Sequence, residues 1–171
     1  MIVLGIDPGS RVTGYGVIRE VSGMLSLVDA GVVRTNASAN MDERLGQIFF
    51  RLCEIIELHR PEEGAIENIF QARNAASALK LGQARGAAVV ACARSRVPVF
   101  SYEPTMVKKS IVGVGRADKT QVAFMVSRLL GVNKPDWALD SSDALAVAVC
   151  HVNQQRFFRL AKMTSPEGTR S

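Results

Sequence analysis

The sequence lacks the features of disulfide-bonded and membrane-spanning proteins. It holds three cysteines in 171 residues, far apart and without a C-x-x-C pair, so neither a disulfide framework nor a thiolate zinc site is expected. The longest apolar runs, residues 86–93 and 144–150, fall far short of the roughly 20 residues that a membrane span needs. No basic stretch precedes the turn at residues 7–9, so we expect no signal peptide. We therefore expect a cytoplasmic protein with reduced, buried cysteines and no membrane partner.

The chain is also too short for the two-lobed architecture of the actin-like and sugar-kinase ATPases, which need about twice its length. At roughly 150 residues per domain, one domain is the expectation. Lysine and arginine total 21 against 16 aspartate and glutamate residues, which gives a formal net charge of +5. This balance permits a nucleic-acid or anionic-surface partner but does not by itself prove one.

Hydrophobic periodicity predicts an α/β fold. Apolar runs rich in β-branched residues predict strands, and apolar residues spaced three and four apart predict helices. The expected strands are 2–6, 14–19, 25–35, 64–67 and 97–101, and the expected helices are 42–59, 74–94, 103–112, 118–130 and 141–153. This order indicates a mixed five-stranded sheet, an antiparallel meander followed by parallel strands, with helices on both faces. Residues 1–153 form the expected domain, and residues 154–171 are expected to be a basic, flexible C-terminal tail.

Four carboxylates stand at the ends of predicted elements. Asp7 follows the first strand in G-I-D-P-G-S, and Glu67 ends the fourth strand, at the edge where α/β sheets open onto a crevice. Asp140 and Asp143 are three residues apart, on one face of the start of the last helix. Each has an ordinary explanation as well: a turn aspartate, a solvated edge residue, or helix capping.

Taken together, the four carboxylates indicate a metal site. Like charges gathered at one place repel one another and raise one another's pKa values, so such a set needs compensation. Oxygen ligands on rigid elements suit Mg²⁺ or Mn²⁺ rather than zinc. Two such ions about 4 Å apart would neutralise the cluster and clamp a phosphodiester for in-line attack by water.

Long stretches of the sequence resemble the RuvC family of bacterial Holliday-junction resolvases, in order and register from Met1 to about His151. They are G-I-D-P-G-S-R-V-T-G-Y-G, A-I-E-N-I-F-Q-A-R-N-A-A-S-A-L-K-L-G-Q-A-R-G, V-G-V-G-R-A-D-K-T-Q-V and D-S-S-D-A-L-A-V-A. The resemblance implies a ribonuclease H-like fold and a Mg²⁺-dependent endonuclease that acts as a homodimer on four-way junction DNA. It also implies two metal ions per subunit, with Mn²⁺ as a substitute, and the branch-migration proteins RuvA and RuvB as partners. The four acidic residues of the family map onto Asp7, Glu67, Asp140 and Asp143.

The resemblance also implies DNA-binding residues. Phe70 corresponds to the family aromatic that stacks on a base at the junction, a contact worth about 1–3 kcal/mol. Lys108 and Lys119 correspond to lysines near the scissile strand, with Lys119 offsetting charge in the transition state and Lys108 holding a phosphate. Arg73 is expected to touch a phosphate. From the residues alone, Phe70 fits a core position nearly as well, and a single lysine is usually a solvated surface residue.

The alanine-rich helix expected over residues 74–94 carries Gly82 and Gly86 four residues apart. A face of small residues lets another helix approach closely, and tight packing onto the chain's own sheet is the alternative. In the family this region helps to form the dimer. A two-fold dimer suits a junction, which needs two matched nicks.

Two other motifs do not indicate sites. Residues 113–120 half-resemble a phosphate-binding P-loop, but Asp118 replaces the glycine that is required before the lysine. His59 and His151 are not spaced with the acids as metal ligands. We expect His59 at the surface and His151 at the end of the last helix, where a cation is favoured.

Two functional alternatives stand beside junction resolution. A related ribonuclease H-like nuclease that processes structured RNA shares the G-x-D-P-G start, although the small-residue helix and Phe70 speak against it. A non-catalytic junction-binding module is not expected to keep four carboxylates. Asp136, in the loop before Asp140, is another acid that could be mistaken for a ligand, but the D-x-x-D register favours Asp140.

Overall fold

The strands form one five-stranded sheet in the order β3-β2-β1-β4-β5. The structure is a computed structural model, and it describes residues 1–68 and 74–164. The strands are β1 (Ile2–Asp7), β2 (Val12–Val21), β3 (Met24–Arg34), β4 (Glu63–Glu67) and β5 (Val99–Tyr102). The first three pair antiparallel as a meander, whereas β4 runs parallel to both β1 and β5. The predicted meander followed by parallel strands is confirmed.

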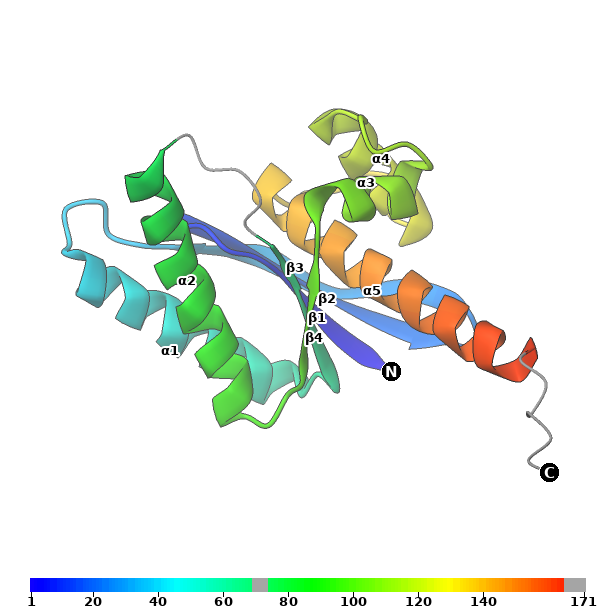
Figure 1. Cartoon of the computed structure of the whole chain (residues 1–171), viewed down its shortest axis with the longest axis horizontal. Helices are drawn as coiled ribbons and strands as arrows, with labels where there is room; N and C mark the ends of the chain where they lie inside the picture. Colours follow the sequence, from blue (N-terminus) through cyan, green and yellow to red (C-terminus); the bar gives the residue numbers. More distant parts are fainter. Residues whose placement is uncertain (69–73, 165–171) are drawn as a thin grey trace, which may run out of the picture.

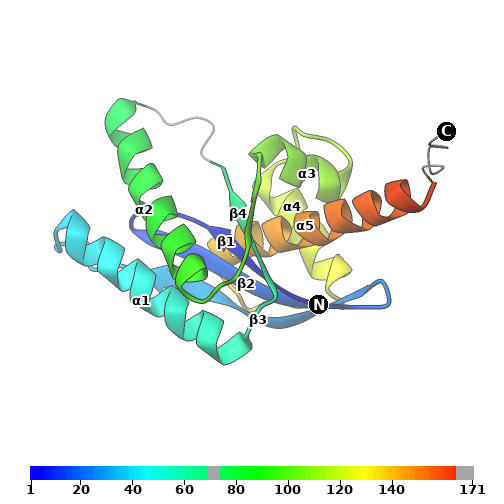
Figure 2. The same cartoon turned by 60° about the horizontal axis from the view of Figure 1, so that its bottom comes forward.

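Helices cover both faces of this sheet, as Figures 1 and 2 show. They are α1 (Met41–His59), α2 (Ala75–Arg94), α3 (Pro104–Val112), α4 (Lys119–Leu129) and α5 (Leu139–Thr164). One hydrophobic cluster joins α1 and α2 to the sheet through residues such as Leu52, Ala88 and Ile66. A second cluster joins α3, α4 and α5 to the opposite face through residues such as Leu145 and Ile18. Among the helices of the two described ranges, none combines the length and apolar character of a membrane span.

Side chains alternate between these two clusters along β1 and β4. Val3 of β1 and Ala65 of β4 belong to the cluster under α5, and the residues that follow them belong to the other cluster. Because alternate residues of a strand share a face, Asp7 and Glu67 also lie on the α5 side. The two acids therefore stand at the carboxyl ends of neighbouring parallel strands, on the same face.

Three glycines let α5 lie directly on the sheet. A Cβ on Gly5 would lie 2.0 Å from the Ala144 carbonyl oxygen, and a Cβ on Gly14 would lie 2.0 Å from the Asp140 carbonyl oxygen. Gly16, which pairs with Gly5 across β1 and β2, would place a Cβ 2.5 Å from a side-chain carbon of α5. Cβ atoms essentially never come within 3.0 Å of another atom, so a side chain at any of these positions would push α5 outward.

The last helix is longer than its predicted range of residues 141–153. α5 continues without a break to Thr164, so residues 154–164 of the expected tail are helical. This segment holds no glycine or proline, and Arg156 ties it to the Glu20 carboxylate at 3.4 Å. The prediction failed because Phe157, Phe158 and Leu160 are more than half exposed and form no buried stripe. Every other element begins and ends within two residues of its predicted range.

The three cysteines are free, as predicted. Cys92 and Cys150 are buried, whereas Cys53 is only half-buried. Burial raises the pKa of the Cys92 thiol to about 12 and that of the Cys150 thiol to about 11. Since the thiolate is the reactive form, these two residues act as small apolar side chains of the core.

Replacing Gly5 with alanine should destabilise the fold by about 2–3 kcal/mol, because a Cβ there meets helix backbone that no rotamer change can move aside. The free energy of unfolding in denaturant measures the loss. Gly46→Ala is the matched control, since Gly46 lies inside α1 and a Cβ there meets nothing nearer than 4.0 Å apart from its chain neighbours and the adjacent backbone of its own helix. We expect this control to gain about 0.5–1 kcal/mol. Similar effects from the two substitutions would contradict the close approach of α5.

Candidate active site

The four predicted carboxylates meet where β1, β4 and the start of α5 come together. Asp7 and Glu67 are the last residues of their strands, and Asp140 and Asp143 lie at the beginning of α5. Asp7, Asp140 and Asp143 each place one carboxylate oxygen within 4.8 Å of the others, an arrangement that can hold a metal ion. All four side chains are half-buried. The structure thus brings together the acids that the sequence places at separate element ends.

Glu67 joins this group in a pocket of about 270 Å³, which it lines together with Asp7 and Asp143. Lys108 of α3 and Lys119 of α4 line the same pocket. A hollow of about 470 Å³ between the C-terminal ends of α1 and α2 is larger, but its lining includes a single acidic residue. The clustered charges rather than the volume therefore mark the smaller pocket as the candidate site.

Burial and crowding disfavour the charged form of Asp7. Its pKa rises from 3.8 to about 8, first because burial removes the carboxylate from water and then because Glu67 and Asp143 carry like charge nearby. Burial also raises the pKa of Glu67. Lys119 opposes both shifts. A bound cation would relieve this repulsion, and a donor set made only of carboxylate oxygens suits a hard divalent ion such as Mg²⁺.

Lys119 reaches the acids from the first turn of α4. Its Nζ donates to Asp143 Oδ2 at 2.5 Å, and this hydrogen bond is the main cause of the raised pKa of Lys119. The helix begins here because Asp118 and Gln121 form a capping box, each side chain accepting from the backbone N–H of the other. Residues 113–118 thus connect the end of α3 to the start of α4.

The turn that follows Asp7 is fixed from two sides. The buried Thr13 hydroxyl donates to the Gly9 carbonyl at 2.8 Å and accepts from the Gly9 N–H at 3.2 Å. From α1, the buried guanidinium of Arg44 donates to the Ser10 carbonyl. The G-I-D-P-G-S segment is therefore held rigidly at the end of β1. Sequence reasoning missed Arg44, because a charged residue in the first turn of a helix normally faces water.

An amide held between two charged side chains fixes the segment after Glu67. Asn68 Nδ2 donates to Glu103 Oε1 at 3.0 Å, and Asn68 Oδ1 accepts from Arg85 Nη2 of α2 at 3.1 Å. The Asn68 N–H donates to the Tyr102 carbonyl at 2.8 Å. These bonds tie the end of β4 to α2 and β5 and hold Asn68, the residue after Glu67, in place. Nothing in the sequence pattern links these residues, which are far apart along the chain.

Two predicted DNA-binding residues cannot be placed relative to this cluster. Phe70 and Arg73 lie outside the described residues. Asp136 is exposed and is not among the clustered acids of the described chain. The D-x-x-D spacing, which favours Asp140 over Asp136 as the site residue, therefore agrees with the positions of the two side chains.

The predicted position of His151 is wrong, whereas His59 lies partly at the surface. The side chain of His59 is only 14% exposed, and its Nε2 lies 2.9 Å from Asp29 Oδ2. His151 is completely buried and lies in the middle of α5, because the helix continues far beyond the predicted end. Each imidazole has a carboxylate partner far away in the sequence, and only that of His151 is removed from water completely.

Known proteins that resemble most of the chain identify its family. The family model described as "Crossover junction endodeoxyribonuclease RuvC" matches residues 3–151. The chain belongs to the RuvC family. The RuvC protein of Oleidesulfovibrio alaskensis is 62% identical over 159 residues, which cover 93% of this chain and 95% of that protein. Thermus thermophilus RuvC in complex with Holliday junction substrate is 37% identical with a TM-score of 0.86, covering 92% of this chain and 96% of that one.

The fold extends beyond close relatives of RuvC. The yeast mitochondrial Holliday junction resolvase Ydc2 has a TM-score of 0.66 at 12% identity, covering 95% of this chain and 84% of that one. This likeness shows the fold alone. The predicted ribonuclease H-like architecture is confirmed by the sheet order and by the RuvC structures. As a member of the RuvC family, the chain is an endodeoxyribonuclease, and the nucleases of this family depend on metal.

Without metal, this RuvC-family chain should lose stability as the pH rises from about 4 to about 8. The pKa of folded Asp7 lies above its ordinary value of 3.8, so the folded chain binds this proton more tightly than the unfolded chain does. The stabilisation is complete below about pH 4 and is lost as the pH rises through about 8. Calorimetric melting in EDTA across this range measures the effect.

Asp7→Asn removes the titrating group, so its Tm should exceed that of the wild-type chain by a margin that grows with pH to several degrees. Asp136→Asn, at an exposed acid, is the control and should follow the wild type. Added Mg²⁺ should raise the Tm of the wild type at pH 8 more than that of Asp7→Asn. Parallel pH profiles for the wild type and Asp7→Asn would contradict the shifted pKa.

Proposed function

We propose that the chain resolves Holliday junctions in recombination and repair by hydrolysing one phosphodiester in each of two strands. One observation carries the proposal: Asp7, Asp140 and Asp143 bring carboxylate oxygens within 4.8 Å of one another, in a pocket lined by Glu67 and two lysines. Membership of the RuvC family supplies the substrate class, since the relatives are named crossover junction endodeoxyribonucleases.

The four carboxylates would hold Mg²⁺, two ions per subunit, with Mn²⁺ able to substitute. When bound, the metal supplies Lewis acidity and a water of lowered pKa as the nucleophile. The pKa of Asp7, raised to about 8, means that a proton leaves this carboxyl as a cation arrives. Metal binding near neutral pH is therefore coupled to proton release at Asp7.

The two lysines would act on the phosphate rather than on the water. Lys119 lies against Asp143 at 2.5 Å and is still 64% exposed, so its ammonium can offset charge that develops on the phosphate in the transition state. Lys108, in the wall of the same pocket, would hold a phosphate of the bound strand. Phe70 would stack on a base, and Arg73 would contact a phosphate.

The distribution of charge supports a DNA substrate. Between Arg94 and Lys119 the sequence holds six basic residues and two acidic ones. The clustered carboxylates form an acidic site beside this basic segment. Because two divalent ions would neutralise the four carboxylates, the surface that faces DNA would become strongly positive only when the site is loaded.

We propose further that the chain acts as a homodimer, because resolution requires two matched cuts. Among the described residues, nothing outside α2 lies within 4 Å of a Cβ placed on Gly82 or Gly86, whereas Ala84 and Ala88 are buried in the chain's own core. The glycine-bearing face of α2 is thus left for a second copy. RuvA and RuvB would be the branch-migration partners, and the cytoplasm, where the bacterial chromosome lies, would be the site of action.

With Mg²⁺, the purified chain should cut a mobile four-way DNA junction at paired, symmetric positions. Asp7→Asn should lower the cleavage rate by at least about 100-fold, because the site then loses a ligand. Asp136→Asn should cleave like the wild type. Cleavage by Asp7→Asn at the wild-type rate would contradict the assignment, binding without any cleavage would favour a non-catalytic module, and preferential cleavage of structured RNA would favour the alternative nuclease.

Lys119→Ala should separate catalysis from binding. Single-turnover cleavage should fall by about 100–1000-fold, since one charge-stabilising donor is lost in the transition state. The Kd for the junction in EDTA should change by less than about threefold, because one phosphate contact among many is removed. Lys134→Ala, at an exposed loop position, is the control. Equal losses of rate and affinity in Lys119→Ala would contradict the role in the transition state.

A further inference from the structure

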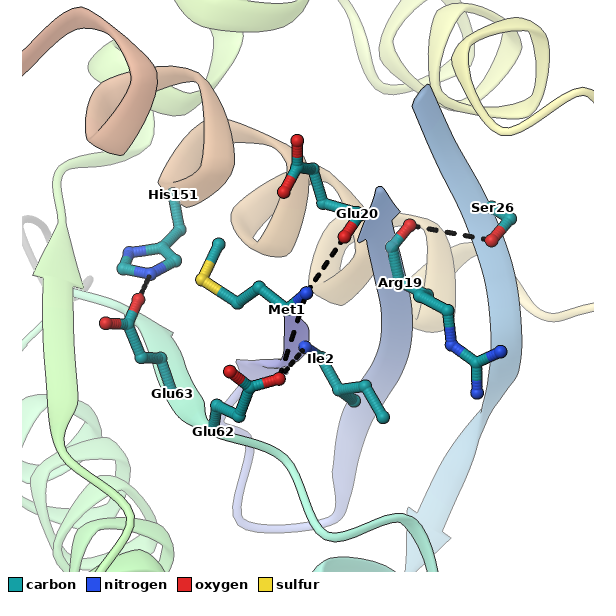
Figure 3. Close-up of polar contacts among 8 residues, drawn as sticks. All are labelled: Met1, Ile2, Arg19, Glu20, Ser26, Glu62, Glu63 and His151. Atoms are coloured by element: carbon teal, nitrogen blue, oxygen red, sulfur yellow. Dashed lines mark hydrogen bonds and ion pairs between the residues drawn. The ribbon is translucent and has the colours of Figure 1, made fainter. Parts of the chain in front are cut away.

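A buried polar network lies on α5, about three turns beyond its first acid. His151 is completely buried. Its Nε2 lies 2.5 Å from Glu63 Oε2, as Figure 3 shows, and its Nδ1 lies 2.7 Å from the Tyr102 hydroxyl. The ring packs against Phe100, with 4.8 Å between the ring centroids. Both imidazole nitrogens therefore have partners, as a buried histidine requires.

The three side chains form a continuous chain of hydrogen bonds. Glu63 pairs with one ring nitrogen and the Tyr102 hydroxyl pairs with the other. Burial raises the pKa of Tyr102 to about 12, so this hydroxyl keeps its proton. The network joins α5 to the first residue of β4 and the last residue of β5.

The network and the acid cluster lie at opposite ends of β4, and on α5 they are separated by about two turns. Glu63 and Glu67 are the first and last residues of β4, about 13 Å apart along the strand. Asp143 and His151 are separated by eight residues, about 12 Å along α5. The distance from Glu63 to Glu67 along β4 therefore matches the distance from His151 to Asp143 along α5. When His151 contacts Glu63, the acids of α5 consequently lie level with Glu67.

The start of β4, where Glu63 contacts His151, is held in place by other polar contacts as well. Glu62, next to Glu63, accepts from the Ile2 N–H at 2.9 Å, and the Met1 ammonium lies 3.8 Å from the same carboxylate. The Met1 ammonium also donates to the Glu20 carbonyl at 2.9 Å, so β1, β2 and the start of β4 are joined there (Figure 3). Loss of the histidine contact would consequently move α5 rather than β4.

We propose that His151 is a positioning residue for the carboxylates that hold the metal. Its bonds to Glu63 and Tyr102 fix the axial position and rotation of α5, so that the acids at the start of the helix meet the acids at the strand ends. The inference rests on the metal-holding role in the proposed function. A slip of one residue would shift the helix by about 1.5 Å and rotate it by about 100°, which would break up the cluster. The contacts with the glycines limit how closely α5 lies, whereas this network sets where it lies along β4.

His151→Leu tests the proposal, because leucine fills much of the space and makes neither hydrogen bond. Calorimetric titration of the folded protein with Mn²⁺ should show at least a tenfold loss of affinity. His151→Gln, whose amide can donate and accept, should recover part of that loss. Val152→Ala is the matched control: Val152 is a buried neighbour on α5, and its truncation should lower the Tm without changing the Mn²⁺ affinity of the folded state.

Wild-type Mn²⁺ affinity in folded His151→Leu would overturn the proposal. If this variant does not fold, Tyr102→Phe removes only the hydroxyl and should weaken Mn²⁺ binding at least threefold, and unchanged affinity there would overturn it as well. Junction cleavage by the wild-type chain is measured separately. A wild type that binds Mn²⁺ without cutting junctions would defeat the proposed function while leaving the positioning role intact.

Discussion

The backbone of α5 lies against glycines of β1 and β2 at a distance that no side chain would allow. Gly14 of β2 lies against the Asp140 carbonyl of α5. The same glycine pairs directly with Asp7 of the neighbouring strand β1. The contact that packs the helix onto the sheet is thus also the contact that brings two of the clustered acids together. A bulkier residue at Gly14 would separate the two halves of the site without altering any carboxylate.

The cluster formed in this way is electrostatically unfavourable in the absence of a cation. Burial and like charge raise the pKa of Asp7 to about 8, and Lys119 compensates only in part. Around this unfavourable centre the chain places rigid polar contacts: Arg44 on the turn after β1, Asn68 after β4, and His151 on α5. These contacts would resist the repulsion between the acids and keep the carboxylates close enough together to share a metal ion.

Sequence patterns predicted the strands, nearly all the helix limits and the meeting of four acids, because each of these follows from local periodicity or from position at an element end. The second half of α5 was missed because its apolar side chains are exposed. The burial of His151 was missed for a different reason: its partner Glu63 is 88 residues away, and periodicity carries no information about such pairs. The need for glycine at positions 5 and 14 likewise appears only once the register of β1 and β2 and the place of α5 are known.

If the strand-end acids and the acids of α5 form one metal centre, anomalous diffraction from crystals grown with Mn²⁺ will locate the ion there without reference to activity. We expect anomalous density between Asp7 and the α5 acids, within about 2.5 Å of their carboxylate oxygens, with Glu67 at the same centre. An ordered Mn²⁺ bound elsewhere, with these carboxylates apart and free of metal, would contradict this expectation.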